Sequence, residues 1–192
     1  MGLLLSAATP PAPLHPPSAW VQRWAHLIAS GGRVLDLACG PGRHAYWLHA
    51  QGFAVTAVDR SPEALASLAP LAAAGAEVLQ AELEDGPWPL AGRRFDAVVV
   101  TNYLWRPRLA EAVAAVGPGG VLVYETFALG NETVGRPARP EFLLRPGELL
   151  QAAAGLRVVA YEDGFLEEHP RFVQRIAAVR ESPTELPPRY RL

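Results

Sequence analysis

The stretch that decides the fold runs from Arg33 to Arg60 and reads RVLDLACGPGRHAYWLHAQGFAVTAVDR. It begins with an apolar run from Val34 to Ala38, broken only by Asp36, of the kind that parallel sheets bury on both faces. A glycine-rich turn, a helical segment and a second apolar run follow, and the second run closes on Asp59. The stretch therefore predicts one β-α-β unit. Open α/β sheets bind ligands at the carboxyl ends of their strands, so we expect a nucleotide site in its first turn.

The glycine turn admits two kinds of cofactor. Gly40 and Gly42 let the backbone approach a ligand closely, and with Ala45 they satisfy the G-x-G-x-x-[G/A] dinucleotide fingerprint, with an acid about twenty residues further on. Asp36 discriminates between the two, because a carboxylate four residues before Gly40 would repel a pyrophosphate. The same carboxylate would attract a cationic end, such as the ammonium group beside the sulfonium of S-adenosylmethionine.

The motifs resemble those of the class I S-adenosylmethionine-dependent methyltransferases. The family's first motif, acid-x-x-x-Gly-x-Gly, is matched by Asp36-Leu-Ala-Cys-Gly-Pro-Gly42. The resemblance continues to about Glu125 and looks closest to small bacterial tellurite-resistance-type methyltransferases. It rests further on the acidic segment Glu82–Asp85, the apolar run Phe95–Val100, and the glycine turn 117–120 with the run that follows it.

The resemblance implies an α/β fold: a doubly wound, three-layer α/β/α sandwich around a mostly parallel seven-stranded sheet with an antiparallel C-terminal hairpin. The residues predict that hairpin over Leu156–Tyr161 and Phe172–Val179, joined by 162–171. We expect a Pro-rich lead over residues 1–17 and a single methyltransferase domain over 18–192.

Local signals place several helices and turns. Ser18 is a typical cap for a helix that carries Trp20 and Trp24 and ends at Gly31-Gly32. Pro62 occupies the favoured first turn of a helix running toward Ala74. The resemblance implies a turn at 117–120 before a strand from Val121 to Glu125.

The resemblance also assigns the cofactor site. Asp36 is expected to hold the methionine ammonium, Asp59 the ribose hydroxyls, and Glu82 with Leu83 the adenine edge, while Arg60 flanks the adenine. Asn102 and Tyr103 would face the sulfonium and the acceptor. The full predicted cofactor set is Asp36, Ala38, Cys39, Gly40, Gly42, His44, Asp59, Arg60, Glu82, Leu83, Asn102 and Tyr103.

Acceptor recognition is expected in the Gly- and Pro-rich segment after Glu125, which leaves the ligand-binding edge of the sheet. Asn131, Arg136 and Arg139 are the candidate substrate-binding residues, since guanidinium groups match carboxylates and phosphates. Methyl transfer needs orientation more than acid–base chemistry. If a base acts, Tyr103 and Glu125 are the candidates, as each ends a predicted strand.

Composition narrows the class of protein. The chain has 192 residues, 50% of them hydrophobic, and a net charge of -2, which does not favour nonspecific nucleic-acid binding. One cysteine excludes an internal disulfide, and the histidines have no metal-ligand spacing with it. No run approaches the roughly 18–20 apolar residues that span a bilayer. We therefore expect a cytoplasmic, bacterial protein without a metal or membrane partner, and the sequence leaves its oligomeric state open.

Three functions remain at this point. The first is a methyltransferase that uses S-adenosylmethionine, releases S-adenosylhomocysteine and acts on an unidentified acceptor, expected to be a small molecule. The second is an NAD-dependent oxidoreductase, which would tolerate loss of Asp36. The third is a non-catalytic S-adenosylmethionine-binding regulatory module, because an intact cofactor motif predicts binding and not turnover.

Overall fold

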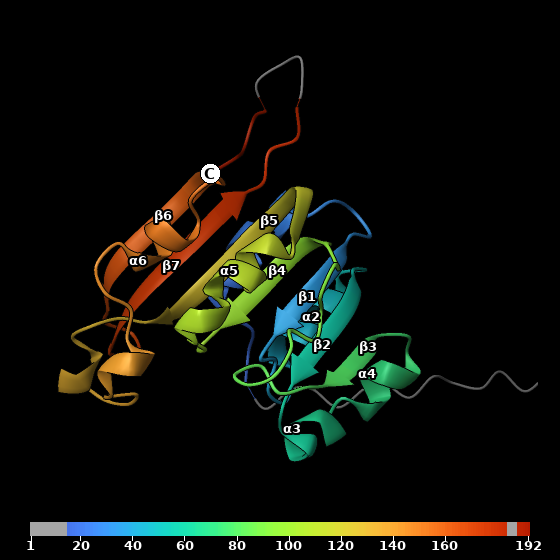
Figure 1. Cartoon of the computed structure of the whole chain (residues 1–192), viewed down its shortest axis with the longest axis horizontal. Coiled ribbons are helices and arrows are strands. Elements are labelled where there is room, and N and C mark those ends of the chain that lie inside the picture. Colours follow the sequence, from blue (N-terminus) through green and yellow to red (C-terminus); the bar gives the residue numbers. More distant parts are fainter. Residues whose placement is uncertain (1–14, 184–187) are drawn as a thin grey trace, which may run out of the picture.

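The computed structural model describes residues 15–183 and 188–192. Most of the predicted Pro-rich lead, residues 1–14, lies outside this range. The described part forms one seven-stranded sheet in the order β3-β2-β1-β4-β5-β7-β6 (Figure 1). The strands are β1 (Arg33–Leu37), β2 (Ala54–Asp59), β3 (Glu77–Gln80), β4 (Phe95–Thr101), β5 (Val116–Phe127), β6 (Arg157–Leu166) and β7 (Arg171–Val179).

The first five strands of the sheet are parallel, and the last two form the antiparallel part. β1 pairs with both β2 and β4 in parallel, whereas β7 runs antiparallel to β5 and to β6. The strands β2 and β3 lie on one side of β1, whereas β4 and β5 lie on its other side. Open α/β sheets form their ligand crevices at such a switch point in strand order. The predicted fold class, including its C-terminal hairpin, is confirmed.

Helices cover both faces of the sheet and create two cores. One core joins α1 (Ala19–Trp24), α2 (Arg43–Ala50), α3 (Pro62–Ala66) and α4 (Ala69–Ala73) to the sheet. The other joins α5 (Leu109–Ala114) and α6 (Glu148–Ala152), which lie in front of the sheet in Figure 1. Alternate strand residues enter opposite cores: Val34 packs into the first and Leu35 into the second. Short 3-10 helices complete the elements at Ala25–Leu27, Arg106–Arg108, Asn131–Thr133 and Pro140–Phe142.

Three predicted elements differ from the structure. The single helix expected from Pro62 to Ala74 is split into α3 and α4, because Pro70 has no N–H to continue a helix. The turn expected at 117–120 lies inside β5 as a bulge, where a side chain on Gly120 would come within 2.8 Å of the Phe95 carbonyl oxygen. The helix after Ser18 is shorter than expected, with Ile28 already extended.

The hairpin is longer than the sequence predicted. Pairing continues from Tyr161 opposite Ile176 down to Leu166 opposite Arg171, through the segment expected to be a connecting loop. The turn itself is therefore only four residues long, 167–170. Within residues 15–183 and 188–192, no helix has the length and apolar character that a membrane crossing needs.

Candidate active site

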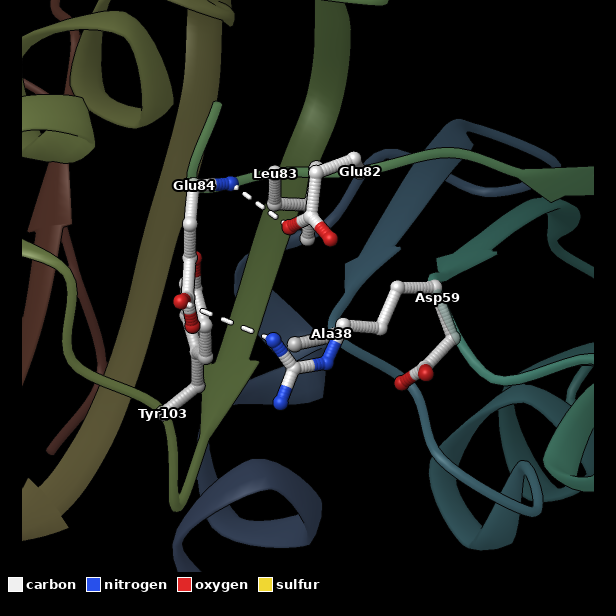
Figure 2. Close-up of a pocket in the computed structure, with 7 residues that line it drawn as sticks. Ala38, Asp59, Glu82, Leu83, Glu84 and Tyr103 are labelled. Atoms are coloured by element: carbon white, nitrogen blue, oxygen red, sulfur yellow. Dashed lines mark hydrogen bonds and ion pairs between the residues drawn. The ribbon is translucent and has the colours of Figure 1, made fainter. Parts of the chain in front are cut away.

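Two adjoining pockets open at the carboxyl ends of the parallel strands. The acidic pocket is lined by Ala38, Asp59, Arg60, Glu82, Leu83, Glu84 and Tyr103 (Figure 2). The turn pocket is lined by His15, Ala38, Cys39, Gly40, Pro41, Arg43, His44, Thr101 and Asn102. Ala38 belongs to both, so the two pockets form one cleft that runs across the end of β1. All of the predicted cofactor residues except Asp36 and Gly42 line this cleft.

Two residues that line the cleft have a strained backbone conformation. Ala38 and Asn102, which follow β1 and β4, have φ angles of 55° and 54°. They are the only non-glycine residues with positive φ among those the structure describes. Left-handed backbone at such residues costs about 1 kcal/mol or more and concentrates at functional sites.

Asp59 connects the glycine turn to the end of β2. One carboxylate oxygen accepts the Gly40 N–H at 2.8 Å and the other accepts the Ser61 N–H at 2.9 Å. The side chain is thus held in one orientation at the wall of the acidic pocket. Each carboxylate oxygen retains a second lone pair for a ligand.

The two turn glycines are required for different reasons. Both have positive φ, 53° at Gly40 and 83° at Gly42. A Cβ on Gly42 would lie 2.1 Å from Cδ2 of the buried Leu68, whereas a Cβ on Gly40 would meet nothing within 4 Å. Gly42 therefore makes room for packing against the α3–α4 segment, and Gly40 keeps the cleft open.

Asp36 is a buried acid with an unused oxygen. Its residue exposure is 1%, and its Oδ2 has no hydrogen-bond partner among the described residues. Burial raises the pKa of Asp36 to about 7, an effect that the Ala45 N–H and the Arg43 charge oppose. Buried carboxylates are normally satisfied, so this oxygen indicates a missing partner. A cation at the glycine turn fits this requirement, and a pyrophosphate does not.

Arg43, the first residue of α2, lines the turn pocket half-buried, and sequence reasoning did not select it. No hydrogen bond or ion pair of its guanidinium is found in residues 15–183 and 188–192. Burial lowers its pKa, which the charge of Glu125 opposes and that of Arg171 reinforces. Its position directly after the glycine turn was the signal that could have identified it.

The uncharged ring of His44 connects the start of α1 to the end of β4. Its Nε2 accepts the backbone N–H of Ser18 at 3.1 Å, and its Nδ1 lies 3.3 Å from the hydroxyl of Thr101. Because a backbone N–H can only donate, the ring proton is on Nδ1 and points to Thr101. Burial, together with the charge of Arg43, lowers the pKa of His44 to about 3.

Acidic side chains and a tyrosine form the other end of the cleft. Glu82 accepts the Glu84 N–H at 3.0 Å, and Glu84 lies 3.5 Å from the guanidinium of Arg60 (Figure 2). The Tyr103 hydroxyl is buried without a hydrogen-bond partner in the described chain. Burial and the nearby acids Glu84 and Glu82 raise the pKa of Tyr103, so its phenol keeps its proton near neutral pH.

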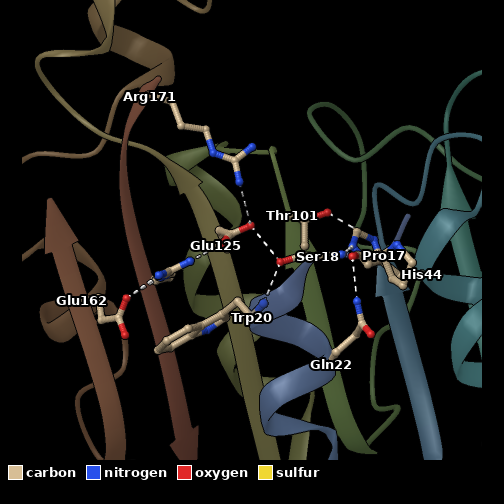
Figure 3. A network of polar contacts seen from close by, with 10 residues as sticks. Pro17, Ser18, Trp20, Gln22, His44, Thr101, Glu125, Glu162 and Arg171 are labelled. Carbon is tan, nitrogen blue, oxygen red and sulfur yellow. Dashed lines mark hydrogen bonds and ion pairs between the residues drawn. The ribbon is translucent and has the colours of Figure 1, made fainter. Parts of the chain in front are cut away.

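Glu125 lies outside both pockets. Its exposure is 2%, and it accepts the Ser18 hydroxyl at 2.9 Å (Figure 3). Arg171 lies 3.8 Å from the same oxygen, and Arg175 lies 3.3 Å from the other. Arg175 in turn donates to Glu162 at 2.7 Å. Glu125 therefore joins the start of α1 to β7.

The predicted substrate residues are not brought to the cleft. Asn131 is 1% exposed, and its amide donates to the Pro137 carbonyl and accepts the Phe172 N–H. Its side chain thus organises the loop. Arg136 and Arg139 line a separate hollow with Phe142.

Cys39 has no sign of reactivity. Burial raises the pKa of its thiol, and the thiol lies against the Gly40 carbonyl. Across the described residues, no group of three or more His, Cys, Asp or Glu side chains is placed to hold a metal ion.

The fold and part of the sequence match known proteins. Residues 34–120 match the family model described as a methyltransferase domain. The protein in the crystal structure of TehB from Haemophilus influenzae has the same fold, with a TM-score of 0.68 and 19% identity, covering 84% of this chain and 61% of that one. The chain therefore has the fold of a class I S-adenosylmethionine-dependent methyltransferase, as its sequence predicted.

Two curated relatives extend the comparison. Hemagglutinin 1 of Eikenella corrodens is 31% identical in an alignment of 140 positions that covers 68% of this chain and 46% of that protein. Malonyl-[acyl-carrier protein] O-methyltransferase of Enterobacter lignolyticus is 39% identical in an alignment of 101 positions that covers 50% of this chain and 39% of that protein. The chain thus matches less than half the length of each.

Proposed function

We propose that this chain binds S-adenosylmethionine in the cleft across the end of β1 and transfers its methyl group to a small-molecule acceptor. One observation carries the proposal: the buried Oδ2 of Asp36 lacks a partner beneath a glycine turn that opens into a pocket. An ammonium group satisfies such an oxygen, whereas the phosphates of a dinucleotide would meet repulsion. The matched methyltransferase domain supports the same cofactor.

The cleft residues fit the parts of this cofactor. Asp59, held by two backbone N–H groups, would accept the ribose hydroxyls. Glu82 and Leu83 would contact the adenine edge, with Arg60 and Tyr103 beside the ring. Asp36 would hold the ammonium, directly or through water.

The cofactor supplies an activated methyl group, and the chain supplies orientation. Transfer from a sulfonium is an in-line displacement, which is accelerated by holding the acceptor in line and excluding water. Asn102, with its left-handed backbone, lies at the wall of the turn pocket where the acceptor would approach.

The surroundings of the two predicted bases support other roles for them. Both oxygens of Glu125 are engaged by Ser18, Arg171 and Arg175, and it lines neither pocket. Burial raises the pKa of Tyr103, which disfavours the phenolate that a base would need, and its protonated hydroxyl is suited to donating a hydrogen bond. We therefore assign Tyr103 to orienting a ligand and Glu125 to positioning α1 and β7.

The experiment that tests this function measures the affinity of S-adenosylhomocysteine by calorimetry for the wild type, Asp59→Ala and Asp163→Ala. Asp163 lines neither pocket, so its variant is the control. We expect Asp59→Ala to lose at least about tenfold in affinity, the value of one or two hydrogen bonds to a charged group. Equal affinity for all three proteins would contradict the assignment.

The two alternatives predict other results. An oxidoreductase would bind NAD and keep that binding in Asp36→Asn. A regulatory module would bind S-adenosylmethionine without producing S-adenosylhomocysteine from it in the presence of any small-molecule acceptor. Formation of S-adenosylhomocysteine above the rate without acceptor would exclude the module.

A further inference from the structure

Arginine side chains outnumber acidic ones around the buried carboxylate of Glu125, at the end of β5. Arg171 lies 3.8 Å from one of its oxygens, and Arg175 lies 3.3 Å from the other. The charge of Glu125 also acts on Arg43. The second acid, Glu162, accepts a hydrogen bond from Arg175 at 2.7 Å. Three arginines thus face two acids, which leaves a surplus of positive charge at this edge of the sheet.

Arg171, the first residue of β7, is the least satisfied of these arginines that contact Glu125. Its Nε is buried and has no hydrogen-bond partner among the described residues. The carboxylate oxygen 3.8 Å from its guanidinium already accepts the Ser18 hydroxyl at 2.9 Å. Buried donors of charged side chains are normally satisfied. Because the Arg171 side chain is also 28% exposed, a ligand from solvent can reach it.

Printed contacts connect Arg171 to the turn pocket. Glu125, its ion-pair partner, accepts the hydroxyl of Ser18, and the backbone N–H of Ser18 donates to His44 at 3.1 Å (Figure 3). His44 lines the turn pocket, and so does Arg43, on which the charge of Arg171 acts. Arg171 therefore lies beside the end of the cleft where we propose that the acceptor approaches.

The side chains near the turn pocket favour an acceptor that needs no base. Both oxygens of Glu125 are engaged, and burial raises the pKa of Tyr103, which disfavours its phenolate. The ring nitrogens of His44 contact the Ser18 N–H and the Thr101 hydroxyl, so neither is free to take a proton from a ligand. A nucleophile that is already ionised, such as a carboxylate, requires no such group.

We propose that the acceptor is a small carboxylic acid, bound as its carboxylate by Arg171 and methylated on a carboxylate oxygen. A guanidinium group matches a carboxylate through two parallel hydrogen bonds, and the unpartnered Nε supplies one donor. A carboxylate oxygen forms the new C–O bond while the C–S bond of the sulfonium breaks, and the electron pair of that bond stays on sulfur. No proton is transferred. This inference rests on the proposed function and names its substrate class.

The test uses S-adenosylmethionine with a labelled methyl group, and a deproteinised extract of bacterial cells as the source of acceptors. Methyl esters of carboxylic acids release methanol in mild alkali, whereas methyl groups on nitrogen, carbon or sulfur are retained. We expect most of the label that the wild type transfers to be released as methanol. Label retained in alkali would overturn the carboxylate step.

Variants of Arg171 test its part in acceptor binding. Arg171→Met should transfer the alkali-labile label about ten- to hundredfold more slowly, because a charge-assisted hydrogen-bond pair is lost. A higher extract concentration should recover part of the rate, and the affinity for S-adenosylhomocysteine should stay at the wild-type value. Arg171→Lys should restore part of the rate, because lysine keeps the charge without the planar fork.

Arg33→Met is the matched control. Arg33 also lies 3.8 Å from an acid, Asp96, but at the amino end of β1. Its substitution should leave the transfer rate unchanged.

Two results would overturn the role of Arg171. Transfer at the wild-type rate in Arg171→Met would show that the acceptor does not need this arginine. An equal loss of S-adenosylhomocysteine affinity in the same variant would show that Arg171 only maintains the site. Failure of the proposed function is a distinct result: the wild type would either not bind S-adenosylhomocysteine, or bind it and transfer no label.

Discussion

Asp36 combines a structural cost with the binding role that we propose for it. Burial raises its pKa from 3.8 to about 7, so the folded chain holds a proton that the unfolded chain has released between these values. Stability falls with rising pH wherever the folded state binds more protons. The free energy of unfolding should therefore decrease from about pH 4 to about pH 7 and level off above, as far as this group determines it.

We predict that Asp36→Asn stabilises the protein at pH 8 by about 1–3 kcal/mol, because it removes a buried charge. At pH 5, where Asp36 is protonated, the variant and the wild type should differ little. The same variant should bind S-adenosylhomocysteine more weakly at pH 8. Urea unfolding at both pH values and calorimetry measure these effects, with Asp163→Asn as the control. Equal destabilisation at pH 5 and pH 8 would contradict the burial argument.

A sequence motif identifies some of the residues around the glycine turn, whereas others are recognised only from contacts in the folded chain. Asp36 and Asp59 could be predicted because their positions relative to the glycine turn are fixed by the chain itself. Arg43 follows the same turn, but its lack of a partner is visible only when Glu125 is seen to be engaged by Ser18, 107 residues away in sequence. No local pattern predicts such a contact.

At the scale of elements, the glycine turn and α2 act as one unit with the α3–α4 segment. The buried Leu68 between α3 and α4 packs where a side chain on Gly42 would lie. Gly40, at the other end of the turn, faces open space. Two substitutions that look alike in sequence should therefore have different effects.

We predict that Gly42→Ala destabilises the protein by about 2–4 kcal/mol, through overpacking and left-handed strain. Gly40→Ala should cost about 1–2 kcal/mol for the strain alone, and should weaken S-adenosylhomocysteine binding at least about tenfold, because its methyl group lies where the ligand approaches the backbone. Urea unfolding and calorimetry on both variants check this. Similar stability losses in the two would argue against the packing role of Gly42.

Ser18 fixes the start of α1 through two contacts of its side chain. Its hydroxyl oxygen accepts the Trp20 N–H at 3.1 Å and donates to Glu125 at 2.9 Å. Ser18→Ala should cost about 1–2 kcal/mol, more than Ser61→Ala, which removes a helix cap without a contact to a buried acid. Thermal unfolding of both variants measures the difference, and a larger loss in Ser61→Ala would contradict it.

Sequence predicted the types of the elements better than their limits. Apolar runs identified the strands, and Ser18 and Pro62 identified helix starts. The break between Ala66 and Ala69, just before Pro70, was missed because the apolar spacing continues across it. The bulge at 117–120 was missed because glycines are typical of turns. Both depend on which backbone groups a neighbouring strand or helix satisfies.

For the whole molecule, the most distant contact in sequence described here joins α1 to β7, the last strand. Trp20 of α1 donates to the Ile176 carbonyl of β7 at 3.2 Å, and the guanidinium carbon of Arg175 lies 4.9 Å from the Trp20 ring centroid. Glu125 connects this contact to the end of β5 (Figure 3). Segments on both sides of the recognised motif in sequence therefore contact each other in the folded chain, and the motif itself predicts the cofactor without the acceptor.

A parallel calorimetric titration of the wild-type protein with S-adenosylmethionine, S-adenosylhomocysteine and NAD distinguishes the proposed cofactor from a dinucleotide. We expect saturable binding at one site for S-adenosylmethionine and for S-adenosylhomocysteine, and no response to NAD. Binding of NAD with no binding of S-adenosylhomocysteine would contradict the role of Asp36, and with it the assignment of the cleft.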